Sequence, residues 1–242
     1  MGALKAFAVL EEDENTGGII FAKHAVTARR IGANEYAGGE FGYVRCHRAP
    51  WADQFAGTGI VPASVMVENG WHFECASCGR QIDSDLAWLY DDGIEEPDTT
   101  DTALRYKGWT PDHVIGSQNS LVYCNRQCKD ENDAYEAKRK RIQDRAIRLY
   151  ERHILRRFPD AEIVRGDDRY MRPHAYATKH KGRWRLTQVA VSFNFPGMKY
   201  GPACLLRDER YDKREPAAFT CCGGDREVFE AYAATPQPTG GR

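Results

Sequence analysis

Two pairs of closely spaced cysteines are the residues of this chain best suited to binding a metal. Two residues separate Cys75 from Cys78, and three separate Cys124 from Cys128. Two such pairs suit the tetrahedral coordination of Zn²⁺, because each pair can hold the ion through one tight turn. We therefore predict that these four cysteines bind one Zn²⁺ ion. Since four thiolate ligands leave no open coordination position for water, we expect the ion to be structural.

The segments around the cysteine pairs predict how each pair is held. Residues 71–75 predict a strand that leads into the first pair, and residues 121–124 predict a strand that leads into a helix carrying the second. A cysteine turn after a strand, facing cysteines in the first turn of a helix, is typical of a treble-clef zinc module. The free amides and the dipole at the start of that helix would stabilise the negative metal–thiolate cluster.

An acidic stretch separates the two cysteine pairs. Residues 81–101 contain eight Asp and Glu residues and no Lys or Arg. Such a run favours a solvated insertion. It also suits contact with a basic partner, including a nucleic-acid-processing enzyme whose groove normally holds phosphates.

A long basic helix is predicted directly after the second pair. Residues 130–158 contain neither Gly nor Pro, and apolar residues from Ile142 to Ile154 recur at steps of three and four. One side of the helix should therefore pack. The cations of the other side either bind phosphates, with Trp184 or Tyr170 stacking on bases, or they are solvated and Trp184 belongs to the core of the sheet. The residues that we predict to contact nucleic acid or a protein partner are Lys138, Arg139, Lys140, Arg141, Arg145, Arg148, Arg152, Arg172, Lys181, Arg183, Trp184 and Arg185.

The rest of the pattern predicts an α+β protein. Residues 1–70 form a small α+β unit with strands at 5–10 and 19–22 and a helix over 25–34 that stops near Gly32. We expect residues 71–158 to form the zinc module, which includes the acidic insertion and the basic helix. Residues 233–242 should form a flexible tail. Residues 159–232 are rich in β-structure, and the strands expected there in one antiparallel sheet are 161–164, 175–178, 184–195 and 203–206.

Composition limits the remaining possibilities. The chain has 242 residues, 42% of them hydrophobic, and a net charge of −1, so we expect a folded protein without a global field that would attract nucleic acid or membrane. No apolar run approaches the roughly 18 to 20 residues of a membrane helix, which predicts a soluble protein. The other cysteines, Cys46, Cys204, Cys221 and Cys222, lack the paired turns of a metal site and carry no assigned role.

One segment resembles a known enzyme family. In the order His113, Asn119 and Cys124, residues 112–124 resemble zinc-containing HNH endonucleases. The resemblance implies that His113 acts as the base that activates water, that Asn119 orients it, and that a second metal stabilises the scissile phosphate. Lys129 and Asp130 stand where that family places a further His or Asn ligand, so the sequence favours binding over catalysis, with an HNH-like nuclease as the alternative.

The whole chain is also similar to small accessory proteins of bacterial viruses and prophages. The similarity lies in residues 21–34, 48–53 and 71–75. It implies a role in phage DNA metabolism or in blocking host defence nucleases, in the cytoplasm of a bacterial host cell. We therefore expect a zinc-stabilised binding protein that recognises nucleic acid or a host nucleic-acid-processing complex that it inhibits.

Overall fold

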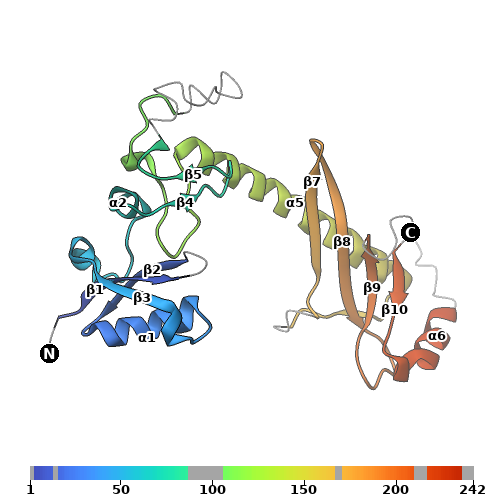
Figure 1. Ribbon diagram of the computed structural model, residues 1–242. Helices are drawn as coiled ribbons and strands as arrows, with labels where there is room; N and C mark the ends of the chain where they lie inside the picture. Colours follow the sequence, from blue (N-terminus) through green and yellow to red (C-terminus); the bar gives the residue numbers. More distant parts are fainter. Residues whose placement is uncertain (1–2, 13–15, 87–105, 167–170, 210–216, 236–242) are drawn as a thin grey trace. The chain divides into compact units, whose positions relative to one another are not determined.

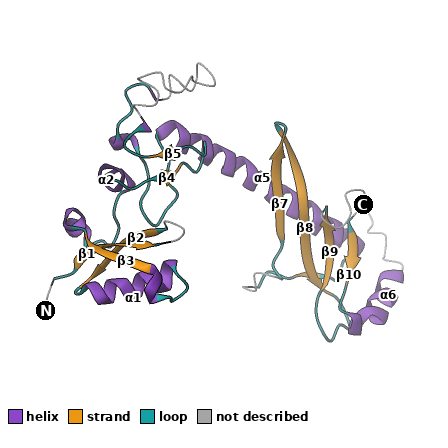
Figure 2. Ribbon diagram, viewed as in Figure 1, coloured by secondary structure: helices purple, strands orange, loops and turns teal. Residues whose placement is uncertain are grey.

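A computed structural model describes residues 3–12, 16–86, 106–166, 171–209 and 217–235 of the protein (Figure 1). The chain divides into two compact units, Met1–Asp133 and Ala134–Arg242. Helices and antiparallel strands occur in both (Figure 2). This confirms the predicted α+β class, with a small N-terminal α/β unit, a long helix and a C-terminal antiparallel sheet. The boundaries of the four predicted segments stay a prediction.

A three-stranded antiparallel sheet begins the first unit. Its strands are β1 (Lys5–Glu11), β2 (Gly17–Ala22) and β3 (Val44–Arg48), in the order β2-β1-β3. Helix α1 (Ala25–Tyr36) packs on one face of this sheet. The predicted strands are confirmed, whereas β3, which contains Cys46, was not predicted.

Helix α1 does not stop near Gly32, as the sequence predicted, but continues for another turn. Gly32 is buried inside the helix, and a Cβ atom there would lie 2.3 Å from Cγ1 of Val9 on β1. The glycine therefore serves close packing of the helix on the sheet rather than termination.

The other face of the sheet joins the cysteine-bearing part of the unit. It packs against the 3₁₀ turn η2 (Pro50–Phe55) and the short helix α2 (Ala63–Glu68). The side-chain amide of Gln118 accepts a hydrogen bond from Ile19 N at 3.1 Å and donates one to Ile19 O at 3.2 Å. Gln118, which lies between the two cysteine pairs in sequence, thus hydrogen-bonds to the backbone of the edge strand β2.

Smaller elements of this unit are η1 (Phe41–Tyr43), β4 (Phe73–Glu74), β5 (Gln81–Ile82) and η3 (Pro111–His113).

The second unit is an antiparallel sheet with helices on one face. Helix α5 (Arg126–Arg157) starts in the first unit and continues into the second. The strands follow in the order β10-β9-β8, and both β6 and β7 pair with the remaining edge of β8. Their bounds are Glu162–Ile163 for β6, His174–His180 for β7, Arg183–Asn194 for β8, Ala203–Asp208 for β9 and Ala218–Thr220 for β10.

The four predicted C-terminal strands are confirmed, whereas β10 and helix α6 (Arg226–Ala234) were not predicted. Helix α6 includes Ala233 and Ala234, the first two residues of the predicted tail. Residues 236–242 of that tail lie outside the described residues.

One aromatic core holds the second unit together. Phe158, which follows α5, packs its ring against Phe193 of β8 at a centroid distance of 5.6 Å and against Phe219 of β10 at 5.1 Å. Phe229 and Tyr232 of α6 complete the cluster. Both helices therefore cover the same face of the sheet, which we call the inner face.

A β-bulge in β8 changes which residues reach that inner face. Tyr176 of β7 pairs with Gln188, but the next residue, Ala177, pairs with Leu186, so Thr187 is an extra residue. Beyond the bulge Trp184 and Leu186 point inward, as do Val189 and Val191 on the other side of it. The opposite or outer face carries His174, Tyr176, Thr178 and His180 of β7, Arg183, Arg185 and Gln188 of β8, and Asp208 of β9.

Candidate metal centre and nucleic-acid interface

The four predicted cysteines come together in the first unit. Their Sγ atoms all lie within 4.8 Å of one another. The Cys78–Cys124 separation is 3.8 Å and the Cys124–Cys128 separation is 3.3 Å. Four sulfurs at the usual Zn–S distance of about 2.3 Å from a tetrahedral ion would be about 3.8 Å apart. The cluster therefore has the size that a tetrahedral metal site requires.

The first pair sits in a tight turn that the sequence builds locally. Cys75 N donates to Arg80 O at 2.8 Å, and Gly79 N donates to Cys75 O at 2.9 Å. Gly79 adopts a φ of 71°, which L side chains rarely adopt. Strands β4 and β5 pair on either side of the turn and close it. Both thiols of the pair thereby face the same point.

The second pair lies at the start of α5. Cys128 N donates to the side-chain oxygen of Asn125 at 2.9 Å, which caps the helix. Cys124 directly precedes the cap, and Tyr123 pairs with Ile115 across a short bridge. This arrangement places Cys128 in the first helical turn, where free backbone amides stabilise negative charge.

Two buried aromatic residues that the sequence did not single out hold the cysteines in place. The hydroxyl of Tyr106 lies 3.2 Å from Cys78 Sγ and 3.3 Å from Cys124 Sγ. The indole Nε1 of Trp109 donates to Cys124 O at 2.6 Å. Such outer-shell donors orient ligands and tune a metal site. Neither residue shows a spacing that would reveal this role, because each reaches the cysteines only through the fold.

The protonation of the cluster also favours a bound cation. The hydrogen bond with Cys124 lowers the pKa of Cys78 to about 6, and the hydrogen bond with Cys128 raises the pKa of Cys124. Burial raises the pKa of Tyr106, so its hydroxyl keeps its proton and donates to the sulfurs. Four neighbouring thiols cannot all ionise together unless a cation offsets their repulsion. The donor set therefore fits a divalent metal.

The remaining cysteines take no part in this cluster. Within the described ranges, the four cysteines are the only group of three or more His, Cys, Asp or Glu side chains placed to share a metal ion. Cys46 Sγ lies 3.5 Å from Ala25 O, and burial raises the pKa of this thiol. Cys204, Cys221 and Cys222 belong to the second unit.

No protein-family model, curated protein or solved structure matches this chain. None of the helices in the described part of the chain has the length and apolar character of a membrane span.

The structure gives His113 a local contact. Its Nδ1 accepts a hydrogen bond from Thr110 N at 3.1 Å, which forms part of the cap of η3. Asn119 is exposed in the turn that Ser117 and Ser120 close by hydrogen bonding. Neither residue joins a group of potential metal ligands among the described residues. The catalytic pair of an HNH-like nuclease therefore stays a prediction.

The predicted cationic residues of α5 divide into groups. Five of them are exposed and recur every three or four residues, and the exposed Arg156, which was not in the predicted set, continues the row. We call these six residues the basic stripe: Lys138, Arg141, Arg145, Arg148, Arg152 and Arg156. They lie on the side of α5 opposite to Ala146 and Ile154, which pack on the sheet. Lys140 is exposed on the flank of the helix, and Arg139 is half-buried and pairs with Glu136.

The predicted binding residues of the β7–β8 hairpin lie in different surroundings. Arg183 and Arg185 are exposed on the outer face, and Lys181 lies in the turn, at a φ of 47°. Trp184 instead packs on Tyr135 of α5, with ring centroids 4.8 Å apart. Its ring is thus engaged inside the unit, and the exposed aromatic residue of the hairpin is Tyr176, at 56% exposure.

Three other predicted features are Arg172, Tyr170 and the acidic stretch. Arg172 is exposed just before β7. Tyr170 lies outside the described residues, as does most of the acidic stretch, of which only residues 81–86 are described. The proposed contact of that stretch with a basic partner stays a prediction.

Proposed function

We propose that this protein binds nucleic acid, that the basic stripe of α5 contacts the phosphate backbone, and that the cysteine cluster holds a structural Zn²⁺ ion. The observation that carries the proposal is the basic stripe. Six exposed cations share one face of a single helix, and none of them forms an ion pair within the described part of the chain. They are therefore available to bind phosphate.

The dimensions of the basic stripe suit a nucleic-acid backbone. From Lys138 to Arg156 the helix extends for about 27 Å at about 1.5 Å per residue. A rigid row of charges of this length can follow consecutive phosphates, and each phosphate neutralised releases condensed counterions. Five of the six cations are arginines, which also donate two parallel hydrogen bonds to a phosphate.

The inward side of the same helix explains why the stripe is rigid. Ala146 and Ile154 are buried against the sheet, and Phe158 anchors the end of the helix in the aromatic core. The phosphate contacts would thus be made by long side chains on a backbone that is already ordered. Binding then costs side-chain entropy alone rather than the folding of a helix.

The cysteine cluster supports a structural rather than a catalytic metal. Cys75, Cys124 and Cys128 are almost fully buried, and the donor set consists of four sulfurs. Zn²⁺ is the first-row ion that four thiolates in tetrahedral array most often hold in proteins. Bound there, it would fix the first turn of α5 to the hairpin of β4 and β5.

The experiment measures affinity as a function of salt. Fluorescence anisotropy with labelled 20-nucleotide single strands and 20-base-pair duplexes would give Kd between 50 and 200 mM salt. If all six cations contact phosphate, the slope of log K against log salt is about −5 for a duplex and about −4 for a single strand. The absence of binding at 50 mM salt would overturn the proposal.

Matched variants locate the contact. Replacing Arg145, Arg148 and Arg152 together by Gln should reduce the magnitude of the slope by about three, since each lost phosphate contact removes about one. The control replaces Lys23, Arg30 and Lys107, three exposed cations of the first unit, by Gln and makes the same change in net charge. Equal loss of affinity in both variants would indicate that net charge rather than the basic stripe governs binding.

A further inference from the structure

Strand β3 is an open edge of the three-stranded sheet in the first unit. The strand order is β2-β1-β3, so β1 lies on one side of β3, and none of the described strands pairs with its other side. An edge of this kind presents a row of backbone N–H and C=O groups to the solvent. An extended peptide can pair with such a row and add a strand to the sheet.

The pairing with β1 shows which backbone groups of β3 point to the open edge. Ala49 N donates to Ala6 O at 3.0 Å, and Glu12 N donates to Tyr43 O at 2.9 Å. Because hydrogen-bonded and non-hydrogen-bonded pairs alternate in an antiparallel ladder, the odd-numbered residues of this segment direct their backbone groups to β1, and the even-numbered residues direct theirs outward. The N–H and C=O groups of Cys46 therefore point to the open edge.

The first turns of helix α1 lie beside this edge. Arg29 Nε donates to Val44 O at 2.8 Å, and Ala25 O lies 3.5 Å from Cys46 Sγ. The helix and the edge border a hollow with a volume of about 410 Å³. A strand added to β3 would therefore direct the side chains of one of its faces toward α1.

The hollow is lined mainly by apolar side chains. Val26 of α1 is 64% exposed, and Phe41, which precedes β3, is 41% exposed. The guanidinium of Arg29 lies over the Phe41 ring, 4.3 Å from its centroid, and holds this ring at the hollow. Exposed apolar side chains beside an open edge favour a ligand that buries apolar side chains of its own on the same face.

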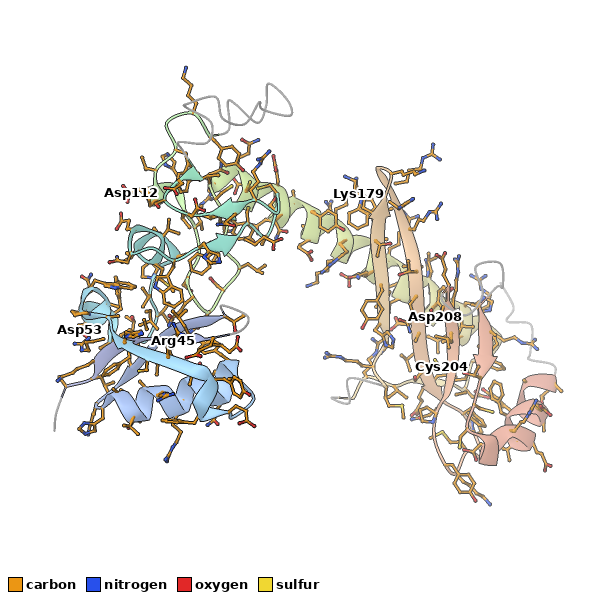
Figure 3. The ribbon with its side chains drawn as sticks, in the orientation of Figure 1. Arg45, Asp53, Asp112, Lys179, Cys204 and Asp208 are labelled. Atoms are coloured by element: carbon orange, nitrogen blue, oxygen red, sulfur yellow. The ribbon has the colours of Figure 1, made fainter. Side chains whose placement is uncertain are left out.

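The charges on the other face of β3 distinguish between ligands. That face carries Arg45 and His47, both exposed, and Figure 3 labels Arg45 on this strand. The Arg45 side chain pairs with Glu12 and is still 66% exposed. An antiparallel second copy of β3 would place Arg45 opposite the same basic residues of the other chain, which destabilises the pair. An acidic strand is instead attracted.

We propose that the edge of β3 and the hollow beside α1 bind an extended acidic peptide of a partner protein, which adds a fourth strand to the sheet. The peptide residue opposite Cys46 is apolar and enters the hollow. Its two neighbours, opposite Arg45 and His47, are acidic. The ligand is thus recognised by its alternation, while backbone pairing supplies affinity. This site is independent of the proposed binding of nucleic acid, because the basic stripe belongs to the second unit.

The test titrates the full-length protein with labelled, end-capped peptides of seven residues. The probe alternates Glu and Val, with Glu at both ends. One comparison peptide replaces every Glu by Lys, and another keeps the composition of the probe but places all Glu before all Val. We expect the probe to bind at least about tenfold more tightly than either, because it alone matches both faces of β3. Equal affinity for the grouped peptide would overturn a strand-like ligand, and equal affinity for the Lys peptide would overturn an acidic one.

Methylation of the peptide backbone tests the pairing itself. Methyl groups on the three Val nitrogens of the probe remove the N–H groups that face β3. Affinity should fall at least about tenfold, because the hydrogen bonds to the edge are lost. Methyl groups on three Glu nitrogens, which face away from β3, should change affinity less than about twofold. Equal effects of the two modifications would overturn the addition of a strand.

Matched variants locate the contact on the protein. Val26→Asp places a carboxylate in the hollow and should lower the affinity for the probe at least about tenfold. Thr27→Asp makes the same change of charge at an exposed neighbour that is not among the lining residues, and should leave the affinity unchanged. Both positions lie in the first turn of α1, where Asp stabilises a helix. Equal affinities of the two variants would overturn the hollow as the site.

Pairing with a second copy is the competing outcome. Sedimentation velocity of the unaltered protein over a range of micromolar concentrations should show no dimer that Val26→Asp dissociates. Such a dimer would overturn the peptide of a partner protein and assign the edge of β3 to self-association.

Discussion

The two compact units bury their side chains in different ways. In the first unit, the buried residues that the structure describes form three separate clusters, one of them built around Cys75, Cys124 and Cys128. In the second unit they form one continuous cluster around Phe158. A small separate core buries less apolar surface than one continuous core, so it gains more from a metal that links its elements. The difference predicts that a metal would contribute more to the stability of the first unit than to that of the second.

Removing the metal should produce the largest effect. Cys124→Ser, or treatment with a strong chelator, should abolish the protected structure of the first unit, because structural Zn²⁺ contributes on the order of 10 kcal/mol to folding. Hydrogen exchange with mass spectrometry resolves the two units, and elemental analysis should find about one Zn per chain. We expect the second unit to keep its protection.

The matched control for that experiment is Cys46→Ser, which makes the same substitution in the first unit outside the cluster. It should retain the metal and the protection of the unit. A metal-free protein whose first unit keeps its full hydrogen-exchange protection would show that this unit does not depend on a metal.

Truncating the aromatic core tests the second unit. Phe158→Ala should destabilise the second unit by about 3–5 kcal/mol, because the ring is fully buried and leaves a cavity. Zinc content and protection of the first unit should not change. Leu155→Ala, at a position that is 42% exposed, is the control and should have little effect. Loss of zinc in the Phe158 variant would show that the units do not fold independently.

A smaller effect is expected from the hydroxyl that contacts two of the sulfurs. Tyr106→Phe keeps the buried ring but removes the hydrogen bonds to Cys78 and Cys124. Metal affinity, measured by competition with a chromogenic chelator, should fall by about 10- to 100-fold. Tyr123→Phe serves as control, since its hydroxyl bonds to Asn132 instead. Equal affinities of the two variants would show that the Tyr106 hydroxyl does not tune the site.

The smallest expected effect concerns pH and the second unit alone. The carboxylate of Asp225 accepts hydrogen bonds from Lys199 N, Tyr200 N and Gly201 N at 2.9, 2.8 and 3.2 Å. Burial raises the pKa of Asp225, but these three donors outweigh it and hold the pKa below its ordinary value of 3.8. A lowered folded-state pKa gives stability that is present above pH 3.8 and is lost as the pH falls through the folded value.

Thermal unfolding of Asp225→Asn between pH 3 and pH 6 measures this contribution. The variant should be less stable than the natural chain at pH 6, and the difference should shrink as the pH falls. Asp160→Asn is the control, because Asp160 is exposed. A constant difference across this range would contradict the role assigned to the carboxylate.

The metal centre could be predicted from the sequence only in part. Spacing identified all four cysteines, because each pair occupies one turn and turns are local. Tyr106 and Trp109 could not be identified, since they lie 18 and 15 residues before Cys124 and reach it through packing that no local pattern records. The helical period likewise predicted an apolar side and a cationic side for this helix, because position on a helix depends on neighbouring residues alone. The predicted set did not separate Arg139 and Lys140 from the basic stripe and did not include Arg156.

The β7–β8 hairpin shows where sequence-based prediction fails. Simple alternation cannot reveal that Thr187 is an extra residue, and so it cannot tell which side chains of β8 share a face. For Trp184 the sequence left open either stacking on a base or a place in the core of the sheet, and the structure packs its ring on Tyr135. Gln188 and Asp208 of the outer face were not singled out. Strand pairing with two neighbours decides this arrangement, and pairing is a property of the whole sheet.

The bulge also determines which changes of length the hairpin can tolerate. Deleting Thr187 would restore plain alternation, with Gln188 outward, Leu186 inward and Trp184 still inward. If Thr187 were kept but paired regularly with Ala177, Arg183 and Arg185 would face Tyr135 of α5 and Trp184 would face solvent. Related chains can therefore lack the bulge residue without exchanging the charged and apolar sides of this strand.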